Sequence, residues 1–467
     1  MTTQKIQPHA TIVGAGLGGV MMAIRLARRN YSVDVYERRP NINQVHGGQR
    51  SFTITLSKRG LIALDEIGLM KDALANSRPI SGRMVHNPDG TTTYVPYSKD
   101  NREQLHAIRR NDMNALLYQA AQQYPNIKFF FNHSLTRMDK ATNTLWFQDQ
   151  VKTEQGVTEV QTPLILGCDG VFSAVRQNMQ RGERADFHQD FLDWGYKDVF
   201  IPAEANGRHA LRPDALHLWP RGNCTFFAFP NVDGTFAGNF IAPFEFGEQL
   251  TTPEANAELL RHDFADLLNV APVMPQHLAA LPMSHFITMQ TTQWHYKDRI
   301  VLLGDAAHAV TPFWGEGMNS AFEDTSVLDA CLAELPDDRT AAFAQFQATR
   351  KPNTDLLAEM AKQNFIELRD TTRSLRVVSR KSIERKLYQL FPDKWLPLNI
   401  MVSHRPMSYV DAMARYQKQQ RLAKRCGMDV LATLVAVGPA TQRALQKISR
   451  AAQPRSKHAA AKEVNLQ

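Results

Sequence analysis

The stretch Ala10-Thr11-Ile12-Val13-Gly14-Ala15-Gly16-Leu17-Gly18-Gly19 decides the fold, because a short apolar strand breaks at a GxGxxG turn and continues as a helical pattern to Arg29. Gly14 permits the tight turn, Gly16 lets backbone N–H groups approach a pyrophosphate, and Gly19 lets the helix pack closely on the strand. The phosphates would lie at the positive end of that helix. This segment predicts a Rossmann-like unit that binds a dinucleotide.

The next predicted strand, residues 32–36, ends in the carboxylate of Glu37. It follows the glycine turn at about the twenty-residue spacing at which an acid accepts hydrogen bonds from the ribose hydroxyls of an adenosine. An acid at this place disfavours a 2′-phosphate, so FAD or NAD fits better than NADP. The candidate cofactor-binding residues in this part of the chain are Gly14, Gly16, Leu17, Gly19, Glu37 and Arg38.

Two later segments repeat the pattern of a buried strand followed by a turn that carries a carboxylate. Residues 164–166 lead into Gly167-Cys168-Asp169-Gly170, and residues 300–303 lead into Gly304-Asp305-Ala306-Ala307-His308. A carboxylate at the carboxyl end of a parallel strand suits a ribityl hydroxyl of a flavin. Each aspartate could instead cap a helix or solubilise a loop.

The turn after the second of these segments, Pro312-Phe313-Trp314-Gly315-Glu316-Gly317, precedes a helix that we predict from Met318. Backbone N–H groups at the start of this helix can point at the pyrimidine edge of an isoalloxazine ring. Because the three segments are far apart in the sequence, they predict a discontinuous flavin-binding domain. Further candidate cofactor-binding residues are Asp169, Asp305, Pro312, Gly317, Met318 and Asn319.

In this order, the GxGxxG, DG and GD segments resemble the fingerprints of the class A FAD-dependent aromatic hydroxylases, from about residue 10 to about residue 414. Within that family the sequence is most similar to the kynurenine 3-monooxygenases. The stretches that carry this similarity are residues 82–86, 214–220, 312–313 with 317–319, and 409–415. The resemblance implies that NADPH reduces FAD, that O2 forms a flavin hydroperoxide, and that an aromatic ring is hydroxylated.

The substrate that the resemblance implies is L-kynurenine, hydroxylated at the 3-position. The alternatives are another aminoaryl or bicyclic aromatic compound, and a flavin-holding binding protein without oxygenase activity. In this family the flavin carries the chemistry, so we assign no catalytic side chain and interpret His308 as structural. The absence of a second GxGxxG agrees with a family that needs no separate NADPH domain.

Four polar residues are candidates for holding the substrate. The fork of Arg83 with the nearby phenol of Tyr97 suits an amino acid carboxylate, although an exposed strand arginine more often pairs with a neighbouring aspartate. Asn364 and Glu367 lie on the otherwise apolar stripe of a helix predicted over 353–369, where they either bond to each other and to backbone or line a pocket. The resemblance matches all four to the family's kynurenine-binding pocket.

The resemblance assigns two more residues and shows three departures. It matches Phe313 to a residue beside the substrate ring and Arg110 to an arginine on FAD, with core packing and a surface charge as the respective alternatives. Trp314 replaces a usual small, aromatic or His residue, Glu316 a usual Gln, and Asn399 a Tyr offered to the substrate carboxylate. Losing that hydrogen bond would cost about 1.5 to 3 kcal/mol, or very roughly ten- to hundredfold in affinity.

Glu316 is the more consequential departure if it is ionised. A carboxylate close to the flavin pyrimidine would oppose the negative charge of reduced flavin. The side chain could point away, be protonated, or pair with a substrate amine. We count Glu316, Trp314 and Asn399 among the candidate substrate-binding residues.

The fold class that follows is α/β, with a discontinuous Rossmann-like FAD-binding domain, an antiparallel-sheet substrate domain and a C-terminal helical region. Alternating aromatic-rich runs between residues 186 and 286 indicate the antiparallel sheet. Pro352, Pro392, Pro397 and Pro406 are expected to break the later helices. The predicted boundaries are 1–75, 106–180 and 290–350 for the FAD-binding domain, 76–105 and 181–289 for the substrate domain, and 351–467 for the helical region.

Composition agrees with such an enzyme, because 467 residues allow about three domain-sized units. The net charge of +8 is modest and forms no basic stripe interleaved with aromatics, so we expect no nucleic acid partner. The four cysteines lack metal-ligand spacing, so we expect reduced thiols, no metal site and a cytoplasmic protein. The first residues lack the apolar core of a signal peptide.

Basic residues gather at 369–386 and in the tail at 443–462. We interpret them as a solvated helix face and a frayed tail, with contact to an anionic membrane surface as the alternative. The apolar stretch 430–437 ends at Gly438-Pro439, well short of the roughly twenty residues that a membrane span requires. The expected partners are the aromatic substrate, NADPH and O2, and the sequence does not indicate an oligomeric state.

Overall fold

The computed structural model describes residues 7–41, 52–152, 156–370 and 375–428. By its internal contacts the chain divides into two compact units. The first comprises residues 1–370 with 398–415, and the second comprises 371–397 with 416–467. All of the candidate cofactor and substrate residues belong to the first unit.

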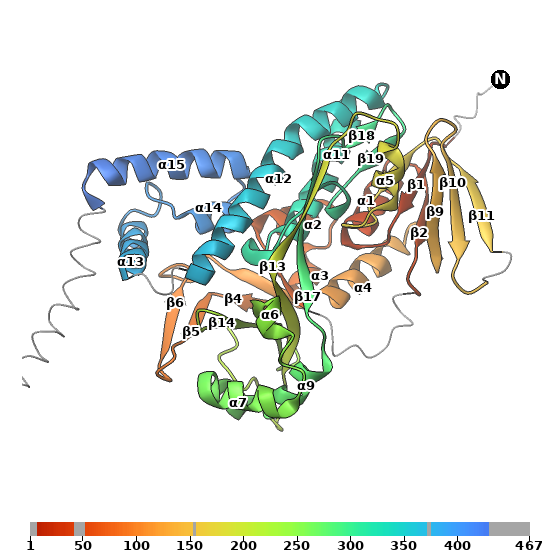
Figure 1. Ribbon diagram of the computed structural model, residues 1–467. Helices are drawn as coiled ribbons and strands as arrows, with labels where there is room; N and C mark the ends of the chain where they lie inside the picture. Colours follow the sequence, from red (N-terminus) through yellow and green to blue (C-terminus); the bar gives the residue numbers. More distant parts are fainter. Residues whose placement is uncertain (1–6, 42–51, 153–155, 371–374, 429–467) are drawn as a thin grey trace, which may run out of the picture. The chain divides into compact units, whose positions relative to one another are not determined.

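A six-stranded sheet forms the flavin-type half of the first unit (Figure 1). Its strands, in order across the sheet, are β18 (His295–Tyr296), β19 (Ile300–Leu302), β12 (Ile165–Gly167), β1 (His9–Val13), β2 (Ser32–Glu37) and β8 (Ile127–Phe131). Neighbours pair in parallel except β18 with β19. Each predicted strand of the three fingerprint segments is therefore present, and their carboxyl ends lie at one edge of one sheet.

Helix α1 (Leu17–Arg28) follows the glycine turn and is buried over almost its whole length. It packs against α11 (Gly317–Glu334) and α4 (Arg110–Ala121), which explains why its sequence is apolar on more than one face. The start of α1 and the start of α11 are thus brought together from opposite ends of the domain. The core of this half consists of the sheet, these helices and residues such as Phe322 and Phe346.

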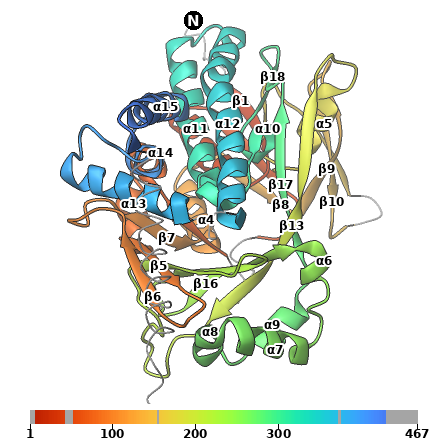
Figure 2. The ribbon, with the colours of Figure 1, turned by 60° about the vertical axis from the view of Figure 1, so that its left-hand side comes forward.

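A seven-stranded sheet forms the other half, as the alternating runs predict (Figure 2). Its strands, in order, are β17 (Ser284–Thr291), β13 (Phe187–Ile201), β16 (Phe236–Pro243), β15 (Thr225–Pro230), β14 (Ala215–Pro220), β5 (Gly82–His86) and β6 (Thr92–Pro96). The pairs are antiparallel except β14 with β5, which is parallel. Helices α7 (Pro253–Asp263), α8 (Ala265–Val270) and α9 (Met274–Ala280) cover one face and complete a second core.

Shorter elements complete the first unit. One three-stranded sheet has the order β3 (Thr53–Leu56), β7 (Leu105–Arg109), β4 (Arg78–Ile80), and another the order β11 (Val157–Gln161), β10 (Thr144–Asp149), β9 (His133–Asp139). The remaining helices of the first unit are α2 (Lys58–Glu66), α3 (Met70–Ala75), α5 (Ala174–Gln180), α6 (Phe244–Gly247), α10 (Asp305–His308), η2 (Pro312–Trp314), α12 (Arg339–Asp370) and α14 (Leu398–His404). Strand β17 also bridges to His308 and Ala309, which joins the substrate sheet to the flavin half.

Helix α12 corrects one expectation, because Pro352 lies inside it and does not break it. A proline ring removes one backbone hydrogen bond, but the helix is held along its length by packing of α12 on α11 and on η2. The helix also runs through residue 351, where we placed the start of the helical region. That boundary therefore does not coincide with the end of an element.

The second unit contains α13 (Leu375–Leu390) and the later part of α15 (Tyr409–Arg425). Within it, Gln420 Nε2 donates to Glu384 Oε1 at 2.8 Å, and Arg380 donates to Gln420. The predictions for the stretch 430–439 and the tail at 443–462 lie outside the described residues, as do the side chains of 368–378 in the first basic run. Among the helices described, none combines the length and apolarity that crossing a membrane requires.

Candidate flavin and substrate site

The glycine turn after β1 has the geometry that a pyrophosphate requires. Gly14 has a φ of 105°, and a Cβ there would lie 2.4 Å from the carbonyl oxygen of Cys168. A Cβ on Gly19 would lie 2.1 Å from the carbonyl oxygen of Gly14, so neither position accepts a side chain. A Cβ on Gly16, the residue before α1, would meet no atom within 4 Å. The open approach to the start of α1 fits a phosphate group.

Glu37 at the end of β2 faces the same turn. Its Oε2 accepts from the backbone N–H of Ala15 at 2.8 Å, and its Oε1 accepts from Arg39 N and Nε at 3.0 and 2.8 Å. Burial works to raise the pKa of this carboxyl, but the hydrogen bonds and charge of Arg39 outweigh it and hold the pKa below its usual value. Glu37 is thus an ionised acceptor beside the turn, while Arg38 is exposed.

The two later aspartates differ in their surroundings. Asp169 accepts from Ser173 Oγ at 2.5 Å and from Val175 N at 3.1 Å, so its carboxylate caps the start of α5. Asp305 begins α10 and its side chain is exposed, yet desolvation by the surrounding protein raises the pKa of its carboxyl. The charge of Arg110 opposes this rise. The carboxylate at the end of β19 is therefore open to a ligand although protein surrounds it. Such a carboxylate could accept a hydrogen bond from a ribityl hydroxyl.

Arg110, the first residue of α4, is close enough to this carboxylate to interact with it electrostatically. Burial lowers the pKa of its guanidinium, while Asp305 acts to raise it. The phenol of Tyr196 on β13 is also close enough to interact electrostatically with Arg110. Arg110 therefore lies between the flavin-type sheet and the substrate sheet, which supports its assignment to the cofactor.

The turn before α11 is fixed by a single buried amide. Asn319 Nδ2 donates to the carbonyl oxygens of Thr55 at 2.9 Å and Gly315 at 3.0 Å, and its Oδ1 accepts from Ser57 N at 3.0 Å. Gly315 has a φ of 69°, and a Cβ there would lie 2.8 Å from Oγ1 of Thr55. The side chain of Asn319 thus holds the backbone of residues 315–317. Asn319 would therefore act on flavin binding indirectly, by fixing that backbone.

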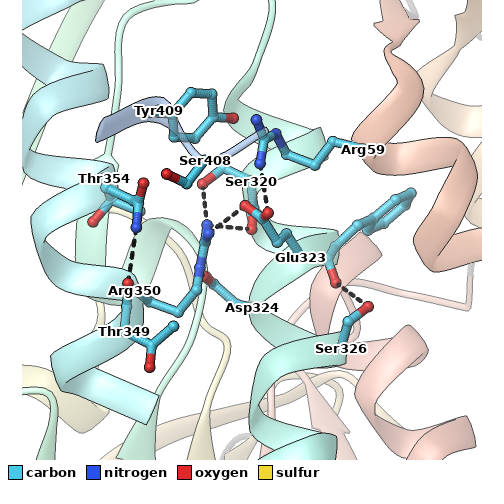
Figure 3. Close-up of polar contacts among 12 residues, drawn as sticks. Arg59, Ser320, Glu323, Asp324, Ser326, Thr349, Arg350, Thr354, Ser408 and Tyr409 are labelled. Atoms are coloured by element: carbon cyan, nitrogen blue, oxygen red, sulfur yellow. Dashed lines mark hydrogen bonds and ion pairs between the residues drawn. The ribbon is translucent and has the colours of Figure 1, made fainter. Parts of the chain in front are cut away.

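A cluster of charged side chains, of which Figure 3 shows Asp324, Glu323 and Arg350, contacts the turn that carries Asp305. Asp324 on α11 accepts from Gly304 N at 3.0 Å, from His308 Nε2 at 2.6 Å and from Arg350 Nε at 2.7 Å. Burial works to raise the pKa of Asp324, but His308 and Arg350 outweigh it and lower that pKa. His308 therefore contacts protein groups that fix the turn, which supports a structural role.

The Glu316 side chain points into the protein, where three hydroxyl groups hold it. Its side chain is 1 % exposed and accepts from Ser57 Oγ at 3.1 Å, Tyr409 Oη at 3.2 Å and Ser403 Oγ at 3.0 Å. Burial raises the pKa of its carboxyl to about 7, although Arg59, 3.8 Å away, opposes the rise. Direct contact of Glu316 with a substrate amine is not supported by this arrangement.

Aromatic rings from three elements surround Phe313. Its ring centroid lies 5.1 Å from that of Phe286 on β17 and 4.8 Å from that of Phe365 on α12. Tyr196 extends the group beside Phe286 at 4.8 Å, and Trp194 extends it beside Phe365 at 5.5 Å. These rings provide an apolar wall where the substrate sheet meets η2 and α12.

Two polar side chains pin η2 to α12. Asn364 Nδ2 donates to the carbonyl oxygen of Phe313 at 2.5 Å, and Trp314 Nε1 donates to the carbonyl oxygen of Met360 at 2.8 Å. Asn364 is half-buried, and Glu367, one turn later, is exposed. The Asn364 side chain therefore reaches the aromatic group, as its assignment to the substrate pocket requires.

Arg83 and Tyr97 form the polar end of this region. The guanidinium carbon of Arg83 lies 6.0 Å from the centre of the Tyr97 ring, and that ring lies 5.4 Å from the ring of His404 on α14. Arg405, the next residue, donates to both carboxylate oxygens of Glu103 at 2.9 and 2.7 Å. Within the described ranges Arg83 makes no ion pair, so the alternative of pairing with a neighbouring aspartate is not what the structure shows.

Helix α14 joins the polar end to the flavin turn. Ser403 contacts Glu316 beside that turn, and the following residue, His404, contacts Tyr97. Burial lowers the pKa of His404 to about 4, so its ring is neutral near pH 7. Asn399 lies half-buried at the other end of α14. The sequence did not point to the following residues of the site, because their proximity depends on tertiary packing: Glu103, Trp194, Tyr196, Phe286, Phe365, Ser403 and His404.

Comparisons with known proteins identify a flavin-binding domain in this chain. Residues 8–354 match the family model described as an FAD binding domain. The chain is similar to a kynurenine 3-monooxygenase of Salinispora arenicola, with 41% identity over 448 residues, 95% of this chain and 97% of the relative. It is also similar to a kynurenine 3-monooxygenase of Sus scrofa, with 33% identity over 414 residues, 88% of this chain and 87% of the relative.

Solved structures share the fold. A tetrameric form of 2-methyl-3-hydroxypyridine-5-carboxylic acid oxygenase superposes with a TM-score of 0.65 and 18% identity, covering 82% of this chain and 97% of that one. PqsL of Pseudomonas aeruginosa, described as a probable FAD-dependent monooxygenase, superposes with a TM-score of 0.62 and 20% identity, covering 78% of this chain and 98% of that one. At these identities the likeness concerns the fold alone.

Proposed function

The chain belongs to the FAD-dependent aromatic monooxygenases, in the family of the kynurenine 3-monooxygenases, and from this premise we propose that it hydroxylates L-kynurenine at the 3-position. FAD, when bound, supplies the redox chemistry, with NADPH as the source of hydride and O2 as the source of the oxygen atom. The residues described above would hold FAD at the starts of α1 and α11 and beside Glu37, Asp305 and Arg110.

The observation that carries the proposal is that the protein offers both a polar end, at Arg83 and Tyr97, and an aromatic wall around Phe313. Arg83 offers a guanidinium fork for a carboxylate, and the fork lies beside the phenol of Tyr97. The aromatic group around Phe313 offers a flat apolar surface to a ring. Kynurenine has an amino acid head and an aniline ring, and the two parts match these two regions.

Asn364 would orient the ring. Its Nδ2 donates to the carbonyl oxygen of Phe313, and its Oδ1 is an acceptor for the N–H of an aniline. Burial of the ring among Phe286, Phe313 and Phe365 would exclude water from the reacting carbon. Glu367, one turn beyond Asn364 on α12, is kept as a further candidate for the substrate amine.

The experiment is to mix the purified holoprotein with NADPH, O2 and L-kynurenine and to record the product mass together with the loss of NADPH. A product that is one oxygen atom heavier than kynurenine is the expected result. Loss of NADPH without that product would contradict the proposal. It would mean that kynurenine is at most an effector.

A second candidate substrate class is another aminoaryl or bicyclic aromatic compound. Two observations favour it: Asn399 stands where the family offers a tyrosine, and the indole of Trp314 is pinned on α12 beside the aromatic group. Screening aromatic compounds for faster flavin reduction would separate the two classes. We also keep as a proposal that the basic tail at 443–462 contacts an anionic membrane surface, on the strength of its charge.

A further inference from the structure

Three ionisable side chains form a hydrogen-bonded chain on the α8 side of the seven-stranded sheet. Asp266 Oδ2 lies 2.6 Å from His86 Nδ1, and His86 Nε2 lies 2.8 Å from His217 Nδ1. His217 Nε2 lies 2.9 Å from the carbonyl oxygen of Arg212. Both imidazoles are buried, and the indole of Trp219 stacks on His86 while its Nε1 donates to Asp266 Oδ2 at 2.8 Å.

The partners of these hydrogen bonds determine where the protons of the three side chains lie. The carbonyl of Arg212 can only accept, so His217 Nε2 carries a proton. Burial lowers the pKa of His217 to about 4, so its ring is neutral near pH 7 and its Nδ1 is an acceptor. His86 Nε2 must therefore donate to His217. A further proton then lies between His86 Nδ1 and Asp266.

Asp266 is the carboxylate of this last pair. Burial works to raise its pKa, but the hydrogen bonds from His86 and Trp219 outweigh it and hold the pKa below its usual value. His86 is consequently enclosed between the carboxyl group of Asp266 and the neutral imidazole of His217, and each of its ring nitrogens takes part in one hydrogen bond.

The nearby guanidinium groups are engaged with other partners. Arg221 donates to the carbonyl oxygens of His86 at 2.9 Å and Asp263 at 2.5 Å. Arg212 pairs with Asp214 at 2.6 Å. The hydrogen bonds to Asp266 Oδ2 therefore come from His86 and Trp219.

This chain of bonds lies directly behind the strand that carries Arg83. Side chains alternate along β5, so Arg83 projects from the opposite face to that of His86. Strand β5 pairs in parallel with β14, with Arg83 opposite Leu216 and Met84 opposite His217. Figure 2 shows α8 below this part of the sheet, and Asp266 reaches His86 from that helix. The three bonds thus tie β5, β14 and α8 together three residues from Arg83.

We propose that His86, held by Asp266 and His217, is a positioning residue that fixes strand β5 and thereby the guanidinium of Arg83 for the substrate's carboxylate. The inference rests on the proposed function, because it assumes that Arg83 binds that carboxylate. When one of the three bonds is removed, the end of β5 loosens and substrate binding weakens. The flavin half is built from other elements, so these three hydrogen bonds do not hold it.

The test compares Asp266→Asn with Asp263→Asn in the holoenzyme. Asp263 is a matched control, because its carboxylate also contacts a histidine, the exposed His262, at 2.8 Å but does not contact β5. We expect Asp266→Asn to raise the KM for L-kynurenine by about tenfold, with kcat and FAD content unchanged. Asp263→Asn should keep the wild-type KM.

Equal KM values for the two variants would overturn the proposal, as would a loss of FAD together with a fall in kcat. A second variant, His86→Gln, removes the imidazole that joins Asp266 to His217 and should also raise the KM for L-kynurenine with kcat and FAD content unchanged. An unchanged KM for His86→Gln would overturn the proposal. If the wild type makes no hydroxykynurenine, the proposed function fails; if it does so and Asp266→Asn matches the control, this inference fails alone.

Discussion

Replacing Glu316 with glutamine should remove a pH dependence of stability that the structure builds into the flavin turn. Burial raises the pKa of this carboxyl from 4.5 to about 7, so the folded protein holds the proton more tightly than the unfolded chain. The stability from this proton is complete below the unfolded pKa and is lost as the pH rises through the folded one. Between about pH 5 and about pH 8, the free energy of unfolding should fall by about 2.5 kcal/mol through Glu316 alone.

Glutamine fits the same place, because its oxygen can accept from the hydroxyls of Ser57 and Tyr409 while its amide donates to Ser403. The assay is denaturant unfolding of the holoprotein at both pH values for the wild type, Glu316→Gln and Glu248→Gln. Glu248 is exposed and gives the same change of charge as a control. We expect the wild type and Glu248→Gln to lose this stability with rising pH and Glu316→Gln to retain it. Parallel pH profiles for all three proteins would refute the reasoning.

Three further predictions concern the cofactor turn and the polar end of the site. Gly14→Ala should yield protein without bound FAD, because its Cβ would lie 2.4 Å from the Cys168 carbonyl oxygen at a φ of 105°. Flavin absorbance measures the FAD content, and a variant fully loaded with FAD would contradict the assignment of the turn. Arg83→Gln should raise the KM for L-kynurenine by about ten- to hundredfold with little change in kcat, and an unchanged KM would exclude Arg83 from the carboxylate site. Asn399→Tyr should lower that KM by about tenfold if a phenol there reaches the carboxylate, and steady-state kinetics showing no decrease would remove Asn399 from the substrate site.

The flavin half of the fold was predictable because its motifs act locally. Gly14 and Gly19 each occupy a place where a Cβ would collide with backbone, so the sequence must carry glycine there. The strands ending at Val13, Gly167 and Leu302 are short, mostly apolar runs with turn residues directly after them. Local sequence was therefore enough to place the three carboxyl ends at one sheet edge.

The substrate half was predicted less completely. The alternating runs indicated the sheet, but α7, α8 and α9 between Pro253 and Ala280 went unrecognised. These helices are short, and α8 and α9 have six and seven residues, so they show little helical periodicity. The prediction that Pro352 breaks a helix was wrong, because the packing of α12 on α11 and η2 outweighs this local signal.

The direction of a side chain depended on partners that are distant in sequence. Glu316 turns inward because Ser57, Ser403 and Tyr409 come to it from three other elements. In the same way, His404 reaches Tyr97 only through the fold of α14 onto the β6–β7 connection. Local pattern identifies such residues as unusual, and tertiary structure decides what they contact.

The most direct test of the central claim is to run the reaction of holoprotein, NADPH and L-kynurenine under 18O2 and to determine the mass of the product. The account predicts hydroxykynurenine that contains one 18O atom, formed as NADPH is consumed. Oxidation of NADPH under 18O2 with no labelled hydroxykynurenine would contradict it.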